Sequence, residues 1–533
     1  MAIDTTLSGL QATGYRFRRA HEKSRNGCLR CKQQRKKYRP STSGSETEST
    51  SPNPRTELPS VLSSDHLSDP ISSPRPNTEE DGPGPLNATE LSLLAHYLTH
   101  TSQTIPVDDL DLHALAVGVP NLAFKCKAVM SSLLSLAAAC KCHDIAHEPT
   151  RNPLDAQNLT EIQELMALAE RHHRASLHHI QATMQSSESY DNVLANAALM
   201  VLYASASHSI RVHLAATAKQ YGQRLPTELL PQHSQWISFT RAAHTASSAV
   251  LNDIVEAAAT STVMNTQLEF PRAMPSATGS RILSPQDGPS SKTKRLFLPL
   301  IASTYDRALR SLRRRAERTA ALLLQSPEQH SSASCGSTDR RRVHACLETI
   351  SILEGCTSTA LSTRGSNEWK MPETRNHQRT SILGCSRAVS PWVARYMISV
   401  TSMESPRILR RIIMSFLNQA PTEFLNLVQS VLDSPSTEAG AEKVRTRDSS
   451  ATIELSLTAM HVLAMDIFAH WLVLVMLLDG VWWIRDIGQR ELSQVISLMK
   501  TQNVLGQLAD IGEIWWPESM YLAKRELTPD CLQ

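Results

Sequence analysis

Residues 467–479 read IFAHWLVLVMLLD and contain the longest apolar run of the chain, Trp471 to Leu478. A helix that crosses a membrane needs about 20 consecutive apolar residues, so this run is too short to span one. Polar side chains also interrupt and bracket it, at Asp466, His470 and Asp479. The stretch therefore predicts a helix buried in the core of a folded helical body.

Helical patterns continue on both sides of this stretch. Asn87 and Glu90 have the spacing of a capping box, and Leu91, Leu94 and Leu98 follow at helical spacing on one face. No alternating strand pattern competes with the helices. Further helices are predicted at 160–184 with a stripe of Ile162, Leu165, Leu177 and Ile180, at 193–206, at 235–250 with Trp236 and Phe239 facing inward, at 297–324, 390–400, 407–418 and 421–433.

The linear organisation predicts a basic arm, a linker and a body. Residues 1–20 and 41–85 are predicted to be disordered, and 41–85 holds eleven serines and eight prolines with no apolar period. The helical body is predicted at 86–527, with mobile insertions near 258–294 and 326–340.

Charge is concentrated at the N-terminus. The whole chain of 533 residues has a formal net charge of only +3, but residues 1–40 hold eleven Lys and Arg against two acidic residues. A basic arm on a mildly acidic body indicates an anionic partner that contacts the arm. The ten cysteines are spread thinly and no secretory segment precedes them, which favours a reducing compartment.

The segment 21–40 reads HEKSRNGCLRCKQQRKKYRP and combines thiols with cations. Cys28 and Cys31 have the spacing of a structural zinc half-site. The cations that follow them are the type of residue that contacts a phosphate backbone. We assign metal binding to Cys28 and Cys31, and DNA contacts to Lys32, Arg35, Lys36 and Lys37.

This segment resembles the DNA-binding head of the fungal Zn2Cys6 (C6 finger) transcription factors, in which six cysteines hold two zinc ions. The match is specific around SRNGCLRCK, but Tyr38 stands where the third cysteine is due, and Cys126 is the next cysteine. Only two of the six zinc ligands are present, so we interpret 21–40 as a degenerate remnant. A gene model that skipped an exon would give the same pattern.

The body resembles the regulatory region of the same family. The opening, LNATELSLLAHYLTHTSQT at 86–104, and the segment from Asn121 are similar to its first two helices. The last third, with HWLVLVMLLDGVWWIRDIG at 470–488 and WWPESMYLAKREL at 515–527, resembles regulators of the sterol uptake control type. The resemblance implies an all-helical regulatory domain, a sterol or other apolar ligand, a homodimer and contacts with the transcription machinery.

Several clusters in the body have two interpretations. Cys140, Cys142, His143 and His147 could bind a metal but fit an ordinary helix end better. His172, His173, His178 and His179 favour a solvated polar face, as do Arg310, Arg313, Arg314, Arg315 and Arg318. Trp482, Trp483, Trp515 and Trp516 fit a core better than a pocket for an apolar ligand.

The sequence favours a regulator over an enzyme. It contains no Gly-rich phosphate loop, no Gly-x-Ser-x-Gly elbow and no His-Glu-x-x-His motif. The basic arm predicts nuclear import, with a mitochondrial presequence as the alternative. Two hypotheses remain: a DNA-binding transcription factor in the nucleus, and a regulatory or interaction protein with the same body and an inactive zinc head.

Overall fold

The architecture comes from a computed structural model of the chain. The structure describes residues 85–148, 152–183, 190–261, 288–325, 335–362, 389–401, 408–433, 457–508 and 514–527. All of these ranges lie in one compact unit that begins at Thr78. The basic arm, the zinc-cluster remnant and the linker up to residue 84 lie outside the described residues.

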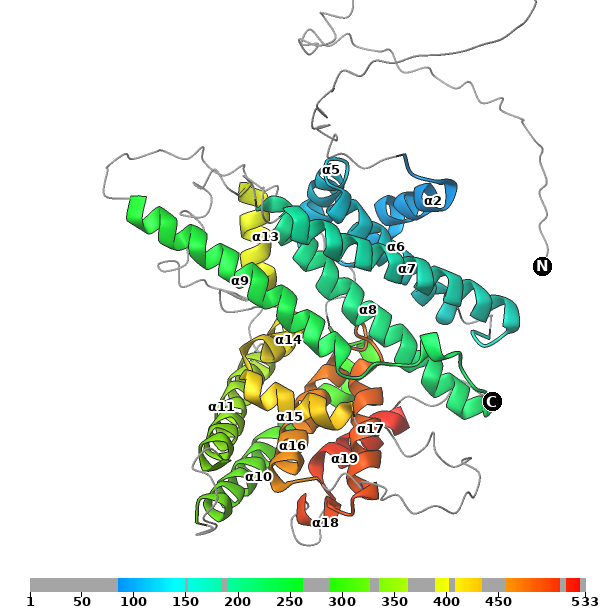
Figure 1. The fold of residues 1–533 in the computed structure, drawn as a ribbon. Coiled ribbons are helices and arrows are strands. Elements are labelled where there is room, and N and C mark those ends of the chain that lie inside the picture. Colours follow the sequence, from blue (N-terminus) through cyan, green and yellow to red (C-terminus); the bar gives the residue numbers. More distant parts are fainter. Residues whose placement is uncertain are drawn as a thin grey trace, which may run out of the picture. The chain divides into compact units, whose positions relative to one another are not determined.

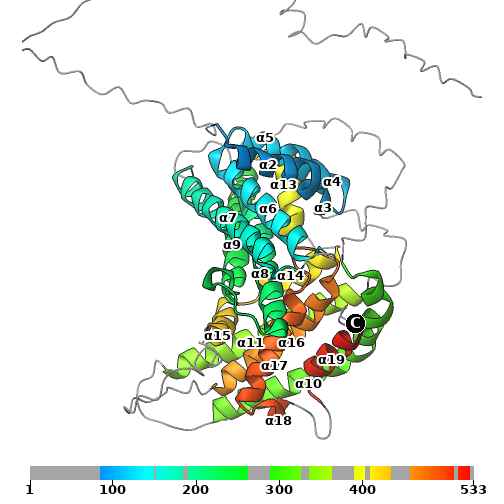
Figure 2. The ribbon, with the colours of Figure 1, turned by 90° about the vertical axis from the view of Figure 1, so that its right-hand side faces the viewer.

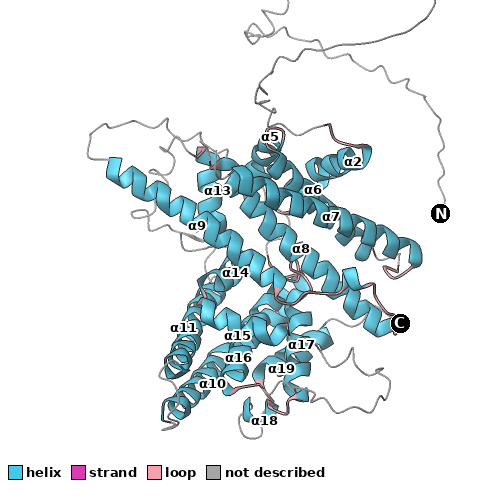
Figure 3. Cartoon of the chain, viewed as in Figure 1, coloured by secondary structure: helices cyan, strands magenta, loops and turns pink. Residues whose placement is uncertain are grey.

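Every regular element among the described residues is a helix or a helical turn, and none is a strand (Figure 3). The predicted all-helical body is therefore confirmed. The first half contains α2 (Ala88–His96), η1 (Tyr97–Thr101), α3 (Ser102–Thr104), α4 (Asp109–His113), η2 (Ala114–Gly118), α5 (Val119–Ala123), α6 (Lys127–Ala146), α7 (Ala156–Thr183), α8 (Asp191–Tyr221), η3 (Thr227–Leu229) and α9 (Gln235–Ser261).

The second half continues with a further series of helices. It contains η4 (Thr293–Phe297), α10 (Leu298–Gln325), α11 (Cys335–Ser362), α13 (Pro391–Thr401), α14 (Leu409–Gln419), α15 (Thr422–Leu432), α16 (Ala459–Val475), η6 (Met476–Leu478), α17 (Ile487–Thr501), α18 (Leu505–Leu508) and α19 (Trp516–Leu527).

The long helices pack in two groups that share one hydrophobic core (Figures 1 and 2). In the first half α6 packs on α7 and α8, and α9 packs on α8. In the second half α16 is surrounded by α10, α11, α15, α17 and α19. Contacts of α17 with α8 and of α14 with α9 join the two groups.

Helix α16 forms the centre of the second group, as its apolar sequence predicts. Trp471 is fully buried, stacks on Phe416 with ring centroids 5.2 Å apart, and donates from Nε1 to the Ile413 carbonyl at 2.9 Å. By length and composition, α8 and α16–η6 are the two described helices that could cross a membrane, but both are almost entirely buried in the protein. Their apolar character is that of core helices.

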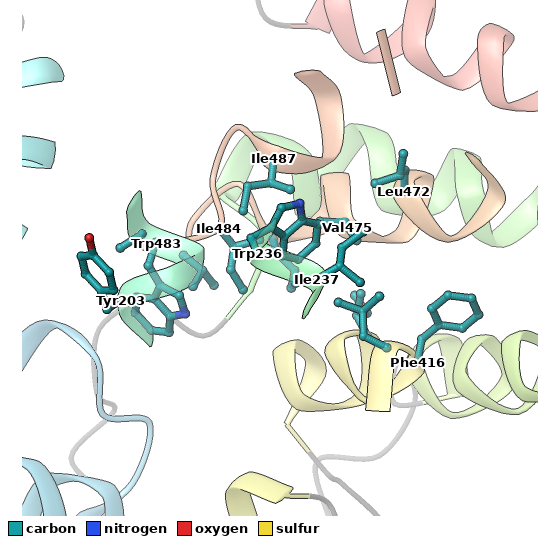
Figure 4. Close-up of a cluster of buried hydrophobic side chains, with 14 of the residues drawn as sticks. Tyr203, Trp236, Ile237, Phe416, Leu472, Val475, Trp483, Ile484 and Ile487 are labelled. Carbon is teal, nitrogen blue, oxygen red and sulfur yellow. The ribbon is translucent and has the colours of Figure 1, made fainter. Parts of the chain in front are cut away.

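The start of α9 inserts into the junction between the two groups. Trp236 and Ile237 lie among Phe416, Leu472, Val475 and Ile487, which come from α14, α16 and α17 (Figure 4). This contact buries the beginning of α9 in the same core as the C-terminal helices. The prediction that Trp236 faces inward is confirmed, whereas Phe239 is only half-buried and contacts His173 edge-on.

The first helix, α2, has the predicted N-terminal cap, but its buried face differs from the predicted one. Asn87 Oδ1 accepts from the Glu90 amide at 2.9 Å, and the Asn87 amide donates to Glu90 Oε2 at 2.8 Å. Leu94 is buried, but Leu91 and Leu98 are exposed. The core side of this segment is formed by Leu93, Leu94 and Tyr97. Leu91 and Leu98 lie on the flanks of the face formed by these three residues, so they point away from the core.

Two helices depart strongly from the sequence patterns: α8 continues to Tyr221, well beyond the predicted 193–206, and α11 is not among the predicted helices. Most other boundaries differ by a few residues. The segment from Asn121 is split, because Cys126 is extended and α6 begins at Lys127. Helix α9 reaches Ser261, and residues 335–340 belong to α11. The insertion predicted near 258–294 is therefore helical at both ends, and the one predicted near 326–340 is helical from residue 335 onward; 262–287 and 326–334 lie outside the described residues.

Candidate functional site

The predicted DNA-binding and zinc-binding residues lie outside the described residues. Cys28, Cys31, Lys32, Arg35, Lys36 and Lys37 therefore keep their assigned roles as predictions, and the candidate sites below are all in the helical body.

A buried polar centre is built around Asp466 of α16. Its Oδ2 accepts from Arg315 Nε at 2.8 Å, and its Oδ1 accepts from Trp515 Nε1 at 2.9 Å. Nδ1 of His470, one turn later, lies 3.3 Å from the same Oδ1. Burial alone would raise the pKa of Asp466, but the charge of Arg315 and the hydrogen bond with His470 outweigh it and lower the pKa to about 2. Asp466 is therefore an anion held by α10, α16 and the segment before α19.

A cavity of about 150 Å³ lies beside this centre. Its wall includes Arg307, Arg315, His470, Trp515 and Trp516, so it is both cationic and aromatic. The ring of Trp516 stacks on His470 with centroids 5.3 Å apart.

The tautomer of His470 defines what this cavity offers to a ligand. Nδ1 lies 2.8 Å from the Asp466 carbonyl oxygen, which can only accept, so Nδ1 carries the hydrogen. In the neutral ring Nε2 is then an acceptor, and this buried atom has no hydrogen-bond partner among the described side chains and backbone groups. A small ligand with a hydroxyl or N–H group would satisfy it.

The four candidate tryptophans separate into two pairs. Trp515 and Trp516 line the cavity, whereas Trp482 packs on His143 and Trp483 lies under the guanidinium of Arg410. Since Trp483 and Trp515 are buried, packing accounts for most of their surface. Trp515 and Trp516 are therefore the pair that lines this cavity.

The prediction that the arginines of α10 form a solvated face is wrong at one position. Arg315 is buried and paired with Asp466, and Arg313 forms an ion pair with Glu354 at 2.7 Å. Arg310, Arg314 and Arg318 are exposed, as predicted. The partner of Arg315 lies on α16, 151 positions away, and helical periodicity carries no information about it.

The cluster Cys140, Cys142, His143 and His147 does not converge on one point. Cys142 Sγ lies 3.8 Å from the Ile162 carbonyl oxygen. His143 stacks on His147, and His147 Nε2 lies 3.5 Å from Asp486 Oδ2. Burial lowers the pKa of His147 to about 4, and hydrogen bonding to Asp486 opposes this shift only in part. His213 is a further partner of Asp486, at 2.9 Å from Nδ1 to Oδ2.

Cys140 instead faces residues that the sequence analysis did not connect with it. Its sulfur lies close to ring nitrogens of His96 and His100 and to a carboxylate oxygen of Asp144, with these four ligand atoms all within 4.8 Å of one another. His96 and His100 come from the α2–η1 segment and Cys140 and Asp144 from α6, each pair four residues apart. Both i, i+4 pairs are visible in the sequence, but only the packing of α2 on α6 brings them together.

A third cluster joins α8 to α17. Glu491 is fully buried, and its Oε1 lies 2.8 Å from His208 Nε2 and 2.7 Å from His233 Nδ1. Because Glu491 lies far in sequence from both histidines, no local pattern predicts this cluster.

The histidine face predicted on α7 is wrong at one position. His173 is buried, with 2 % of its surface exposed, and packs on Tyr203.

Comparison with known proteins gives one match. Residues 92–272 match the family model described as the fungal specific transcription factor domain. The range begins in α2 and takes in α6, α7, α8 and the described part of α9. No curated protein and no solved structure matches the chain. Residues 92–272 are therefore similar to the fungal specific transcription factor domain, which supports a role in regulating transcription.

Proposed function

We propose that this chain is a nuclear DNA-binding transcription regulator of the fungal Zn2Cys6 class. The observation that carries the proposal is the regulatory-domain match at 92–272, preceded in the same chain by the Cys28–Cys31 pair and its basic run. In this proposal the N-terminal segment contacts DNA and the helical body receives a signal or a partner. The sterol uptake control resemblance of the last third belongs to this proposal as well.

The incomplete cysteine set determines what kind of DNA binding we expect. A binuclear cluster normally fixes the helix that reads bases in the major groove. With two of six thiolates, Lys32, Arg35, Lys36 and Lys37 retain the attraction of cations for phosphates, which does not depend on base sequence. We expect dissociation constants on the order of 10⁻⁴–10⁻⁶ M at physiological salt, similar for all duplexes.

The test is titration of the full-length protein against several DNA duplexes at a series of salt concentrations. Replacing Lys32, Arg35, Lys36 and Lys37 by Ala should weaken binding to every duplex and flatten the salt dependence. Replacing the exposed arginines Arg310, Arg314 and Arg318 of α10 by Ala removes a similar charge from the body and should leave binding unchanged. Loss of binding only in this second variant would assign DNA contacts to the body instead.

A second candidate is a regulatory protein that does not bind DNA and acts through its helical body. Tyr38 at the third cysteine position favours it, because a complete cluster cannot form without that ligand. The same titration separates the two: no salt-sensitive binding to any duplex supports this candidate. Tight, zinc-dependent binding to one duplex would instead show that Cys28 and Cys31 belong to a working reader.

The cavity beside His470 supports ligand sensing by the body. Its volume of about 150 Å³ is below the roughly 300–1,000 Å³ of drug-sized ligand sites, so it fits a molecule smaller than a sterol. We propose a small ligand with a hydroxyl or N–H donor for His470 Nε2 and an apolar part for Trp516. A fragment screen by thermal shift, with His470→Phe as the variant that should lose the response, tests this assignment.

A further inference from the structure

Four side chains with metal-ligating atoms converge where the α2–η1 segment packs on α6. His100 Nε2 lies 3.3 Å from Asp144 Oδ2, and His96 Nε2 lies 3.8 Å from the same oxygen. The sulfur of Cys140 completes the set, and all four ligand atoms lie within 4.8 Å of one another. Thiolate, imidazole and carboxylate are the three ligand types that Zn²⁺ takes in proteins.

Two of the distances between these ligand atoms are close to those around a tetrahedral ion. Bonds of about 2.0 Å to nitrogen or oxygen and about 2.3 Å to sulfur place the ligand atoms roughly 3.3–3.6 Å apart in a tetrahedron. The two histidine–carboxylate distances, 3.3 and 3.8 Å, fall at or just beyond this range. Small side-chain movements would therefore suffice, because each residue is one of an i, i+4 pair on a helical scaffold that keeps both members on one face.

The surroundings of the four ligands also suit an ion. His96 Nε2 is buried and has no hydrogen-bond partner among the described groups, whereas most buried polar atoms in proteins are hydrogen-bonded. The other carboxylate oxygen of Asp144 lies 3.5 Å from His143 Nδ1, which can orient the carboxylate from outside the site. Asp144 and His100 are each almost half exposed, which gives an ion a path of entry.

Electrostatics in the protein without an ion are unfavourable for the thiolate. Burial raises the pKa of Cys140 to about 12, and the charge of Asp144 acts in the same direction, while hydrogen bonds from Thr101 and Thr104 oppose it. A divalent cation would deprotonate the thiol and balance the thiolate and the carboxylate.

We propose that His96, His100, Cys140 and Asp144 form a zinc site that clamps the first helices of the body onto α6. Among the described residues, the two other histidine–carboxylate clusters offer three ligands each and no sulfur, so they are less suited than this cluster to a closed structural site. The clamp lies at the start of the region that matches the regulatory domain and is independent of the cysteines at 28 and 31.

The experiment uses the full-length protein with Cys28→Ser and Cys31→Ser, so that those thiols cannot contribute. We expect about one zinc per chain by elemental analysis, in the closed four-ligand site that a structural zinc occupies. After exchange for Co²⁺ we expect intense visible absorption of a tetrahedral ion and a thiolate-to-cobalt charge-transfer band. Cys140→Ser should abolish the charge-transfer band, whereas Cys142→Ser, whose sulfur faces the Ile162 carbonyl, should retain it.

A surface variant keeps the test independent of folding. His100 lies at the exposed side, so His100→Ala should fold normally by circular dichroism and still weaken metal binding at least tenfold, since even outer-shell losses cost roughly 10–100-fold. Added zinc should raise the melting temperature of the background protein and not that of Cys140→Ser. Absence of bound metal in the background protein, or equal loss in the Cys140 and Cys142 variants, would overturn the proposal.

Discussion

Arg315 donates from Nε to Oδ2 of Asp466 across 2.8 Å, and both side chains are buried where α10 packs on α16. Removing one partner of a buried ion pair leaves an uncompensated charge, which costs about 3–5 kcal/mol. We therefore expect Arg315→Ala to lower the free energy of unfolding by this amount, measured by urea denaturation.

The neighbouring residue gives the control for this pair. Arg314 is exposed on the same turn of α10, so Arg314→Ala should change stability by about 0.5 kcal/mol or less. Equal effects of the two substitutions would show that Arg315 is solvated and that the buried pair does not form.

A second buried charge links the start of the body to α14. Asp111 Oδ1 lies 2.6 Å from Arg411 Nη2, and Arg410 approaches Asp111 Oδ2 at 3.4 Å. Asp111→Ala should destabilise the protein by about 3–5 kcal/mol, because it leaves buried guanidinium groups without their carboxylate. Asp109→Ala, two residues earlier and exposed, is the matched control and should be nearly neutral when both variants are measured by urea denaturation.

Gly488 allows α17 to approach the end of α16 closely. A Cβ at this position would lie 2.6 Å from the Met476 backbone nitrogen and 2.8 Å from the Val475 carbonyl carbon, and backbone atoms cannot move aside as a side chain can. We expect Gly488→Ala to destabilise the protein by about 1–3 kcal/mol, the usual cost of overpacking.

Helix propensity alone would predict that Gly488→Ala stabilises the protein. Gly355 in α11 tests the difference, because a Cβ there meets no atom within 4 Å. Gly355→Ala should stabilise the protein by about 0.5–1 kcal/mol through the higher helix propensity of alanine. If both substitutions stabilise it, α17 does not pack as closely as described.

The sequence predicts most of the helices because their signals are local. The capping box at Asn87 and the apolar run around Trp471 each depend on residues within one helix, and both are confirmed. The predictions are wrong where tertiary contacts, and not the local sequence, decide which side chains are buried. Leu91 and Leu98 fit a local stripe, but the packing of Leu93, Leu94 and Tyr97 into the core decides which face of that segment is buried.

The sites were less predictable than the helices for the same physical reason. Arg315 has the local pattern of a solvated face, and its pairing depends on Asp466, which no periodicity connects with it. Cys140 stood out in the sequence as a candidate metal ligand, but its neighbours Cys142 and His143 point elsewhere in the packed structure. The partners His96 and His100 come from another helix, so only the fold identifies them.

We expect Glu491 to make the free energy of unfolding depend on pH in the acidic range. Burial alone would raise the pKa of this carboxyl, but His233 and His208 outweigh burial and lower it from 4.5 to about 2. A carboxyl with a depressed pKa contributes stability that is present above its unfolded pKa and is lost as the pH falls through the folded pKa. The contribution of Glu491 is therefore complete at neutral pH and disappears between about pH 5 and pH 2, and its size is about 3 kcal/mol.

The Glu491→Gln variant isolates this contribution from that of other acids such as Asp466. Glutamine does not titrate, so the free energy of unfolding of the variant should fall less steeply than that of the wild type as the pH is lowered from 5 to 3. Glu317→Gln, at an exposed position of α10, should follow the wild-type curve. Urea titrations at a series of pH values measure all three slopes. A Glu491→Gln curve parallel to the wild type would mean that the carboxylate has the same pKa in the folded and unfolded chains, and that the two imidazoles do not hold it as an anion.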